Sequence, residues 1–145
     1  MTLYAETSAV LAWLLGEAAA ADVRRELGAA GEVFTSVLTL VESDRVLIRA
    51  QVVDGLAEGD VVDRRRALAR AGRHWHLVQL HEEILDRARR PFPGEPVRTL
   101  DALHLASALA VRAAVPDVVI LSLDDDIRRA GADLGFVIAP VDSPS

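Results

Sequence analysis

The sequence has 145 residues, a formal net charge of −6 and no cysteine. This length suffices to bury the core of one domain, and we expect residues 1–145 to form a single domain. The absence of cysteine excludes disulfides, thiolate metal sites and cysteine nucleophiles, and the absence of lysine excludes Schiff-base chemistry and a P-loop. No apolar run approaches the roughly 20 residues that span a bilayer, so we expect a cytoplasmic protein without a membrane partner.

Short apolar runs alternate with helical patterns along the chain. The first run predicts a strand over 3–5, followed by Glu6 and then by Thr7 and Ser8, which can cap a helix. Further strands are predicted over 32–35, 75–80, 118–121 and 136–138, and helices over 18–31, 81–90, 99–114 and 124–134, with two more capped by Ser36 and Asp60. The alternation favours a three-layer α/β/α domain with a central, mainly parallel five-stranded sheet.

The helix that follows Ser36 carries an apolar stripe that includes Leu40, Val41 and Leu47. Residues at this spacing share one helix face, so we expect all three to be buried. The helix over 99–114 is apolar almost all round, which predicts burial between other elements.

Four carboxylates lie where predicted strands end or the next helices begin. Glu6 and Asp124 each follow a strand, Asp101 opens the helix over 99–114, and Glu42 lies one turn into the helix after Ser36. Because the carboxyl ends of parallel strands meet at one edge, these groups would repel one another unless a cation neutralises them. Oxygen ligands without sulfur suit Mg²⁺ or Mn²⁺.

Each of these carboxylates also has a purely structural interpretation. Asp101 and Asp124 can stabilise helix N-termini, and Glu42 can pair with an arginine on its own helix. Asp125 and Asp126 are expected at the start of the last helix, where either could substitute for Asp124. Glu6 can accept backbone N–H groups in its turn. On the same reasoning His104, within the apolar helix, is predicted to be a hydrogen-bonded core residue rather than a metal ligand.

Four stretches of sequence carry a more specific pattern: YAETSAVLAWLLGE, TSVLTLVES, RTLDALHLASAL and LSLDDDIRRAGADLGF. Together they resemble the motifs of PIN-domain ribonucleases, and among those the VapC toxins of toxin–antitoxin pairs, in order and spacing over nearly the whole chain. The resemblance puts Glu6, Glu42, Asp101 and Asp124 at the four acidic positions of the family. The first of these positions is usually aspartate, so Glu6 departs from the pattern by one methylene group.

The resemblance implies a Mg²⁺- or Mn²⁺-dependent endoribonuclease that hydrolyses RNA phosphodiester bonds and acts as the toxin of a toxin–antitoxin pair. The same four carboxylates are its implied catalytic residues. Glu6, Asp101 and Asp124 are the implied metal ligands, and Arg98 is a candidate contact to a substrate phosphate. The neighbouring side chains expected to orient ligands or waters are Thr7, Ser8 and Ser122. The implied partners are RNA, a cognate antitoxin protein and a second copy of the chain in a homodimer. The alternative is a PIN-like module that binds RNA or protein without cleaving, because Glu6 alters the geometry of the site.

Overall fold

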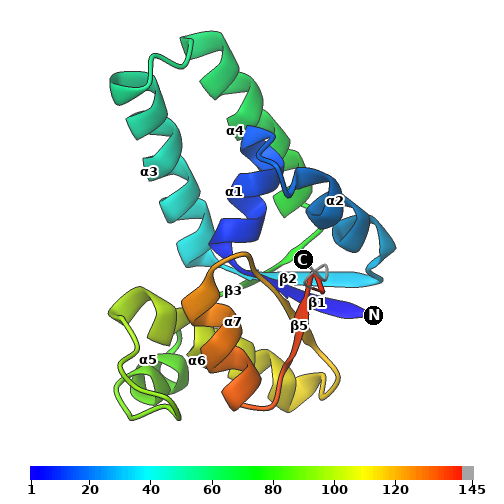
Figure 1. Ribbon diagram of the computed structural model, residues 1–145, viewed down its shortest axis with the longest axis vertical. Helices are drawn as coiled ribbons and strands as arrows, with labels where there is room; N and C mark the ends of the chain where they lie inside the picture. The colour runs from blue at the N-terminus through cyan, green and yellow to red at the C-terminus, as the bar shows by residue number, and fades with distance from the viewer. Residues whose placement is uncertain (142–145) are drawn as a thin grey trace.

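The structure is a computed structural model and describes residues 1–141. In chain order its elements are β1 (Thr2–Ala5), α1 (Thr7–Leu15), α2 (Ala20–Ala29), β2 (Glu32–Ser36), α3 (Val37–Val53), α4 (Glu58–Gly72), β3 (His76–Val78), α5 (Glu82–Ala88), α6 (Thr99–Ala114), β4 (Val119–Leu121), α7 (Asp125–Asp133) and β5 (Val137–Ala139). Figure 1 shows their arrangement. Within this range no helix has both the length and the apolar character needed to cross a bilayer.

The five strands form one sheet in the order β3-β2-β1-β4-β5, with β1 at its centre. Every neighbouring pair is parallel. Ala5 pairs with Leu121, and Leu121 pairs with Ala139, so the carboxyl ends of β1, β4 and β5 lie at the same edge. The predicted α/β/α fold with a five-stranded parallel sheet is confirmed.

Alternation along the central strand divides the core into two parts. Leu3 and Ala5 face one side of the sheet and pack in a cluster with residues of α1, α2 and α4. Tyr4 faces the other side and packs with residues of α6 and α7. Successive side chains of a strand point to opposite faces, so the two helical layers follow from this period of two. The layers lie on either side of the sheet in Figure 1.

Two predictions about α3 and α4 are wrong. Val41 is 60% exposed rather than buried, because the covered face of α3 carries Thr39, Ser43 and Leu47. The two helices run away from the sheet as a pair (Figure 1), so they lack a second apolar layer that would cover the Val41 face. The helix α4 begins at Glu58, before the predicted cap Asp60.

Candidate metal centre at the sheet edge

Glu6 is buried at the junction of β1 and α1, where it is 4% exposed. It is the N-cap of α1, because its Oε2 accepts the Ser8 backbone N–H at 2.6 Å. Its Oε1 accepts hydrogen bonds from the hydroxyl groups of Ser8 and Ser122, each at 2.8 Å. The cap of α1 is therefore Glu6 itself rather than Thr7 or Ser8. Both serines orient the Glu6 carboxylate.

The same hydroxyl groups connect this junction to the one between β4 and α7. The backbone N–H of Leu123 donates to Ser8 Oγ at 2.8 Å, and that of Asp124 donates to Ser122 Oγ at 3.1 Å. Asp124 then caps α7, its Oδ1 accepting the Ile127 N–H at 3.0 Å. Two neighbouring strand-to-helix junctions thus share one hydrogen-bond network, which fixes the start of α7 relative to β1.

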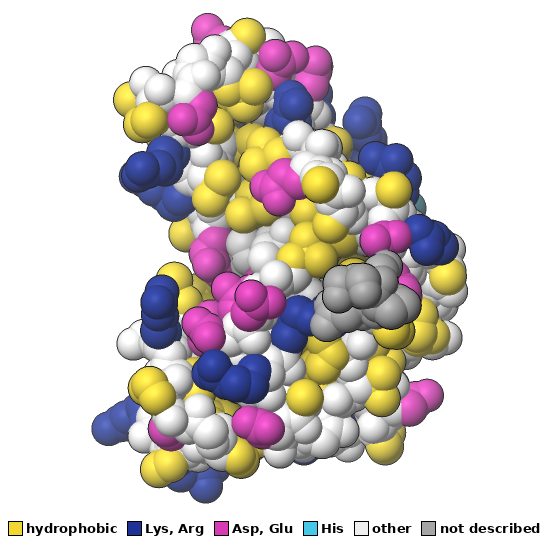
Figure 2. All heavy atoms as spheres, viewed as in Figure 1, with side chains coloured by type: hydrophobic (Ala, Val, Ile, Leu, Met, Phe, Trp, Pro, Cys, Tyr) yellow, Lys and Arg dark blue, Asp and Glu magenta, His cyan; other side chains and the backbone are white. Residues whose placement is uncertain are grey.

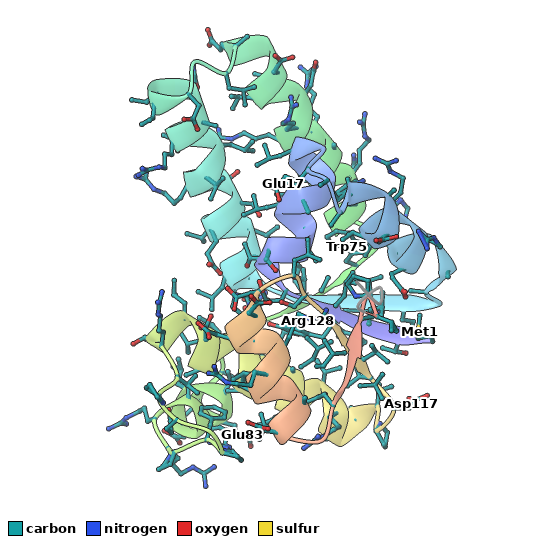
Figure 3. All side chains as sticks on the ribbon, viewed as in Figure 1. Met1, Glu17, Trp75, Glu83, Asp117 and Arg128 are labelled. Carbon is teal, nitrogen blue, oxygen red and sulfur yellow. The ribbon has the colours of Figure 1, made fainter. Side chains whose placement is uncertain are left out.

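Arg128, in α7, adds a second set of hydrogen bonds that holds this helix against the sheet. It lies next to the strand ends in Figure 3. Its guanidinium donates to the carbonyl oxygens of Ser122 and Pro140, each at 2.8 Å. The first turn of α7, with its acidic residues, is consequently anchored both to the β4 end and to the segment after β5.

Three aspartates come together at this edge. Asp101, in the first turn of α6, and Asp124 and Asp126, at the start of α7, each offer a carboxylate oxygen, and these oxygens lie within 4.8 Å of one another. Acidic side chains gather in the middle of the face shown in Figure 2. Asp126 is not among the four carboxylates predicted from the sequence. The acidic run that starts at Asp124 was the signal for it, but spacing alone does not select which member of the run faces Asp101.

The electrostatics of this cluster favour a cation. The pKa of Asp101 is raised, first by burial and then by repulsion from Asp124, Glu6 and Asp126, while His104 partly offsets the rise. Glu6 therefore acts on Asp101 through its charge, although it does not belong to the group of three converging oxygens. Clustered carboxylates without sulfur suit a hard divalent ion such as Mg²⁺ or Mn²⁺, so the residues present fit such a metal.

Glu42 lies in a second network beside the cluster. Its Oε1 accepts hydrogen bonds from His104 Nε2 at 2.7 Å and from Thr7 Oγ1 at 2.9 Å. Burial raises the pKa of Glu42, but the hydrogen bond and charge of His104 and the hydrogen bond of Thr7 outweigh it and leave the pKa lowered. Glu42 thus pairs with a histidine across the fold rather than with an arginine on its own helix.

His104 is a buried, hydrogen-bonded residue, as predicted, and is 2% exposed. A carboxylate only accepts hydrogen bonds, so we assign the proton on Nε2 to the bond with Glu42. The other ring nitrogen, Nδ1, forms a hydrogen bond with the Tyr4 hydroxyl at 2.9 Å. Burial raises the pKa of Tyr4, which keeps this hydroxyl protonated. Tyr4 and His104 therefore fix the position of Glu42.

The fold and the site define a class: a parallel α/β protein with a carboxylate cluster at the carboxyl edge of its sheet. The model of the PIN domain family matches residues 3–133, and the chain belongs to that family. No curated protein matches the sequence.

Solved structures of bacterial toxins share the fold. The sarcin–ricin-loop-cleaving toxin VapC20 of Mycobacterium tuberculosis superposes with a TM-score of 0.64 and 19% identity, covering 89% of this chain and 95% of that one. A toxin–antitoxin complex from Klebsiella pneumoniae gives 0.66 and 16% identity over 99% of this chain and 100% of that chain. VapBC2 of Rickettsia felis, bound to a promoter DNA fragment, gives 0.63 and 9% identity over 95% and 97%. At such identities the likeness concerns the fold.

A divalent ion is expected to stabilise the folded protein through the aspartate cluster. Millimolar Mn²⁺ at about 100 times its Kd should add roughly 2.7 kcal/mol to the free energy of unfolding, because the unfolded chain has no such site. Asp101→Asn should lose most of the resulting rise in melting temperature, measured by differential scanning calorimetry. Asp117→Asn, on an exposed residue away from the cluster in Figure 3, is the matched control. A wild-type melting temperature that Mn²⁺ leaves unchanged would contradict the site.

Without metal, the same Asp101→Asn variant should be more stable than wild type at neutral pH. The raised pKa of Asp101 means that the folded wild type binds this proton more tightly than the unfolded chain does. The folded wild type is therefore stabilised at low pH, and it loses this stabilisation as the pH rises through the raised pKa. The two melting temperatures should therefore converge on acidification. The lowered pKa of Glu42 has the opposite effect, but it is common to both proteins and cancels in the comparison.

Replacing Glu6 separates a capping role from direct metal binding. In Glu6→Gln an amide nitrogen replaces one acceptor oxygen, so a hydrogen bond to Ser8 or Ser122 is lost, at a cost of about 1–3 kcal/mol in the metal-free protein. We expect the Mn²⁺-induced rise to remain largely intact, since the three aspartates still converge. Glu17→Gln, at an exposed position after α1, is the matched control. Complete loss of the Mn²⁺ effect in Glu6→Gln would instead identify Glu6 as a ligand.

Proposed function

We propose that this protein is a metal-dependent endoribonuclease that acts in the cytoplasm as the toxin of a toxin–antitoxin pair, with residues 1–145 forming a single PIN domain. The observation that carries the proposal is the convergence of Asp101, Asp124 and Asp126 within 4.8 Å at the carboxyl edge of a PIN-family sheet. Ligands of open parallel α/β sheets bind at this edge.

The side chains around the cluster have distinct tasks in this proposal. Asp101, Asp124 and Asp126 hold Mg²⁺ or Mn²⁺, and Glu6, predicted as a ligand, supports them by fixing the start of α7. When bound, such a metal lowers the pKa of a water and neutralises charge on the phosphoryl oxygens. Glu42, which Thr7 and His104 keep ionised, orients the attacking water as a hydrogen-bond acceptor.

RNA is the substrate that the comparisons favour. VapC20, which shares the fold, is described as cleaving the sarcin–ricin loop. Carboxylates and a metal can hydrolyse a phosphodiester without a side-chain nucleophile, which agrees with the absence of cysteine. The second candidate is a module that binds RNA or protein without cleaving. It is favoured by the hydrogen bonds of both Glu6 oxygens to the protein itself, which limit their use as metal ligands.

The partners in this proposal are an antitoxin and a second copy of the chain. A cluster of three carboxylates attracts a basic segment, and one solved structure with the same fold is a toxin–antitoxin complex. The apolar side chains exposed on α3 are suited to a contact between two copies: Val41, Val52 and Val53.

Cleavage of RNA is the direct test. Purified protein should cut total cellular RNA in Mn²⁺ or Mg²⁺ and stop when the metal is chelated. Asp101→Asn should lower the rate by roughly 100-fold or more, since a ligand of the charge-stabilising ion is lost. Asp117→Asn should cut at the wild-type rate. A folded protein that binds Mn²⁺ but leaves every RNA intact would favour the non-cleaving module.

Growth measurements test the toxin role. Expression of the wild type should arrest growth, and co-expression with the adjacent small reading frame should restore it through a complex that co-purifies. Asp101→Asn should leave growth unaffected, because it removes cleavage rather than folding. If the wild type degrades RNA in vitro but neither arrests growth nor co-purifies with its neighbour, the protein is a nuclease of another kind.

A further inference from the structure

A hollow of about 360 Å³ lies beside the aspartate cluster. Its wall combines two members of that cluster with two arginines from different elements and with the loop before α6; the lining residues are Pro96, Val97, Arg98, Asp101, Asp126 and Arg129. Small-molecule sites have volumes of about 300–1,000 Å³, so the hollow is of a size for one small ligand such as a nucleotide unit.

Arg98 contributes positive charge at the start of α6. It is the N-cap residue of that helix and makes no side-chain capping hydrogen bond, because a guanidinium has no acceptor. Its side chain is exposed, in contrast to the carboxylate caps Glu6 and Asp124 of α1 and α7. The charged side chain of Arg98 therefore lines the hollow and makes no capping hydrogen bond.

Arg129 comes from the neighbouring helix α7. Its Nη1 lies 3.4 Å from Asp126 Oδ1, with the two side chains 53% and 50% exposed. An ion pair of this length between half-exposed groups is weak, so the guanidinium can turn to an anion that enters the hollow. The pairing leaves Arg129 directly beside one of the three converging carboxylates.

We propose that the hollow is a nucleotide subsite in which Arg98 and Arg129 bind the RNA phosphate next to the scissile one. The lining carries both negative and positive side chains. A polynucleotide suits both, because the aspartates bind it through a metal ion and the arginines bind it directly. Its scissile phosphate lies at the cation held by the aspartates, and the adjacent phosphate lies within reach of two guanidinium groups, which bind phosphate oxygens in pairs. This inference rests on the proposed function, because it takes RNA as the substrate of the same edge.

Binding of a short fluorescein-labelled single-stranded RNA tests the subsite. Fluorescence anisotropy is measured over a range of salt with Ca²⁺ in place of Mn²⁺, and a gel confirms that the RNA stays intact. Arg98→Gln and Arg129→Gln should each weaken binding by roughly tenfold at low salt. The double variant should lower the slope of log Kd against log salt by about 0.7, the value for one phosphate contact on a single strand. Arg66→Gln, on an exposed residue of α4, should bind as wild type.

The outcomes separate the subsite from the nuclease function. The subsite is overturned if wild type binds no RNA, if both variants bind RNA with the wild-type affinity and salt slope, or if they weaken binding only by abolishing the Mn²⁺-induced rise in melting temperature. If both variants lose RNA affinity and keep the Mn²⁺ effect, the subsite holds. In that case, failure of the wild type to cleave any RNA in Mn²⁺ contradicts the nuclease function alone.

Discussion

The buried carboxylate of Glu6 is the group on which the geometry of this edge depends. It accepts one backbone N–H and two hydroxyl groups, and the hydroxyl oxygens in turn accept the backbone N–H groups that lead into α7. A buried charge is tolerated only when it is well solvated by such donors. Because Ser8 and Ser122 come from two different junctions, satisfying this one charge also sets where α7 starts. The position of Asp124 follows from that of Glu6.

The aspartate cluster works in the opposite direction. Burial of Asp101 and repulsion from the neighbouring carboxylates raise its pKa, so the metal-free fold carries an electrostatic cost at neutral pH. A site that destabilises its own fold while empty gains stability on binding a cation, which couples metal binding to folding. The Glu42–His104 pair shows the contrast, since there the partner's hydrogen bond and charge more than offset the burial of the carboxylate. The charge of Glu42 is thus stabilised by a partner within the protein, whereas the charge of the aspartate cluster is left for a bound cation to neutralise.

The sequence was most informative where one periodicity dominates. The helix over 99–114 has the predicted bounds, because an apolar pattern runs its whole length, between the segment that contains Pro91, Pro93 and Pro96 and the strand β4. The pattern failed for Val41, since spacing defines a helix face but cannot say whether a second layer covers it. The predicted ends of strands and starts of helices were enough to place Glu6, Asp101 and Asp124 at this edge. Whether each carboxylate caps a helix or binds a metal depends on the direction of its side chain, which the sequence does not give. Asp124 caps α7 and also joins the cluster, so its two interpretations are compatible.

The net charge of −6 limits how such a protein can engage RNA. The far field of the molecule repels a polyanion, so long-range attraction cannot supply the binding energy. Under the proposed function, affinity must then come from groups that act at contact distance: the cation that the aspartates would hold, and the guanidinium groups of Arg98 and Arg129. Salt screens the distant repulsion and weakens the close contacts at the same time. Such a surface would therefore bind an RNA whose phosphates reach these close contacts, and it would repel a polyanion that does not reach them.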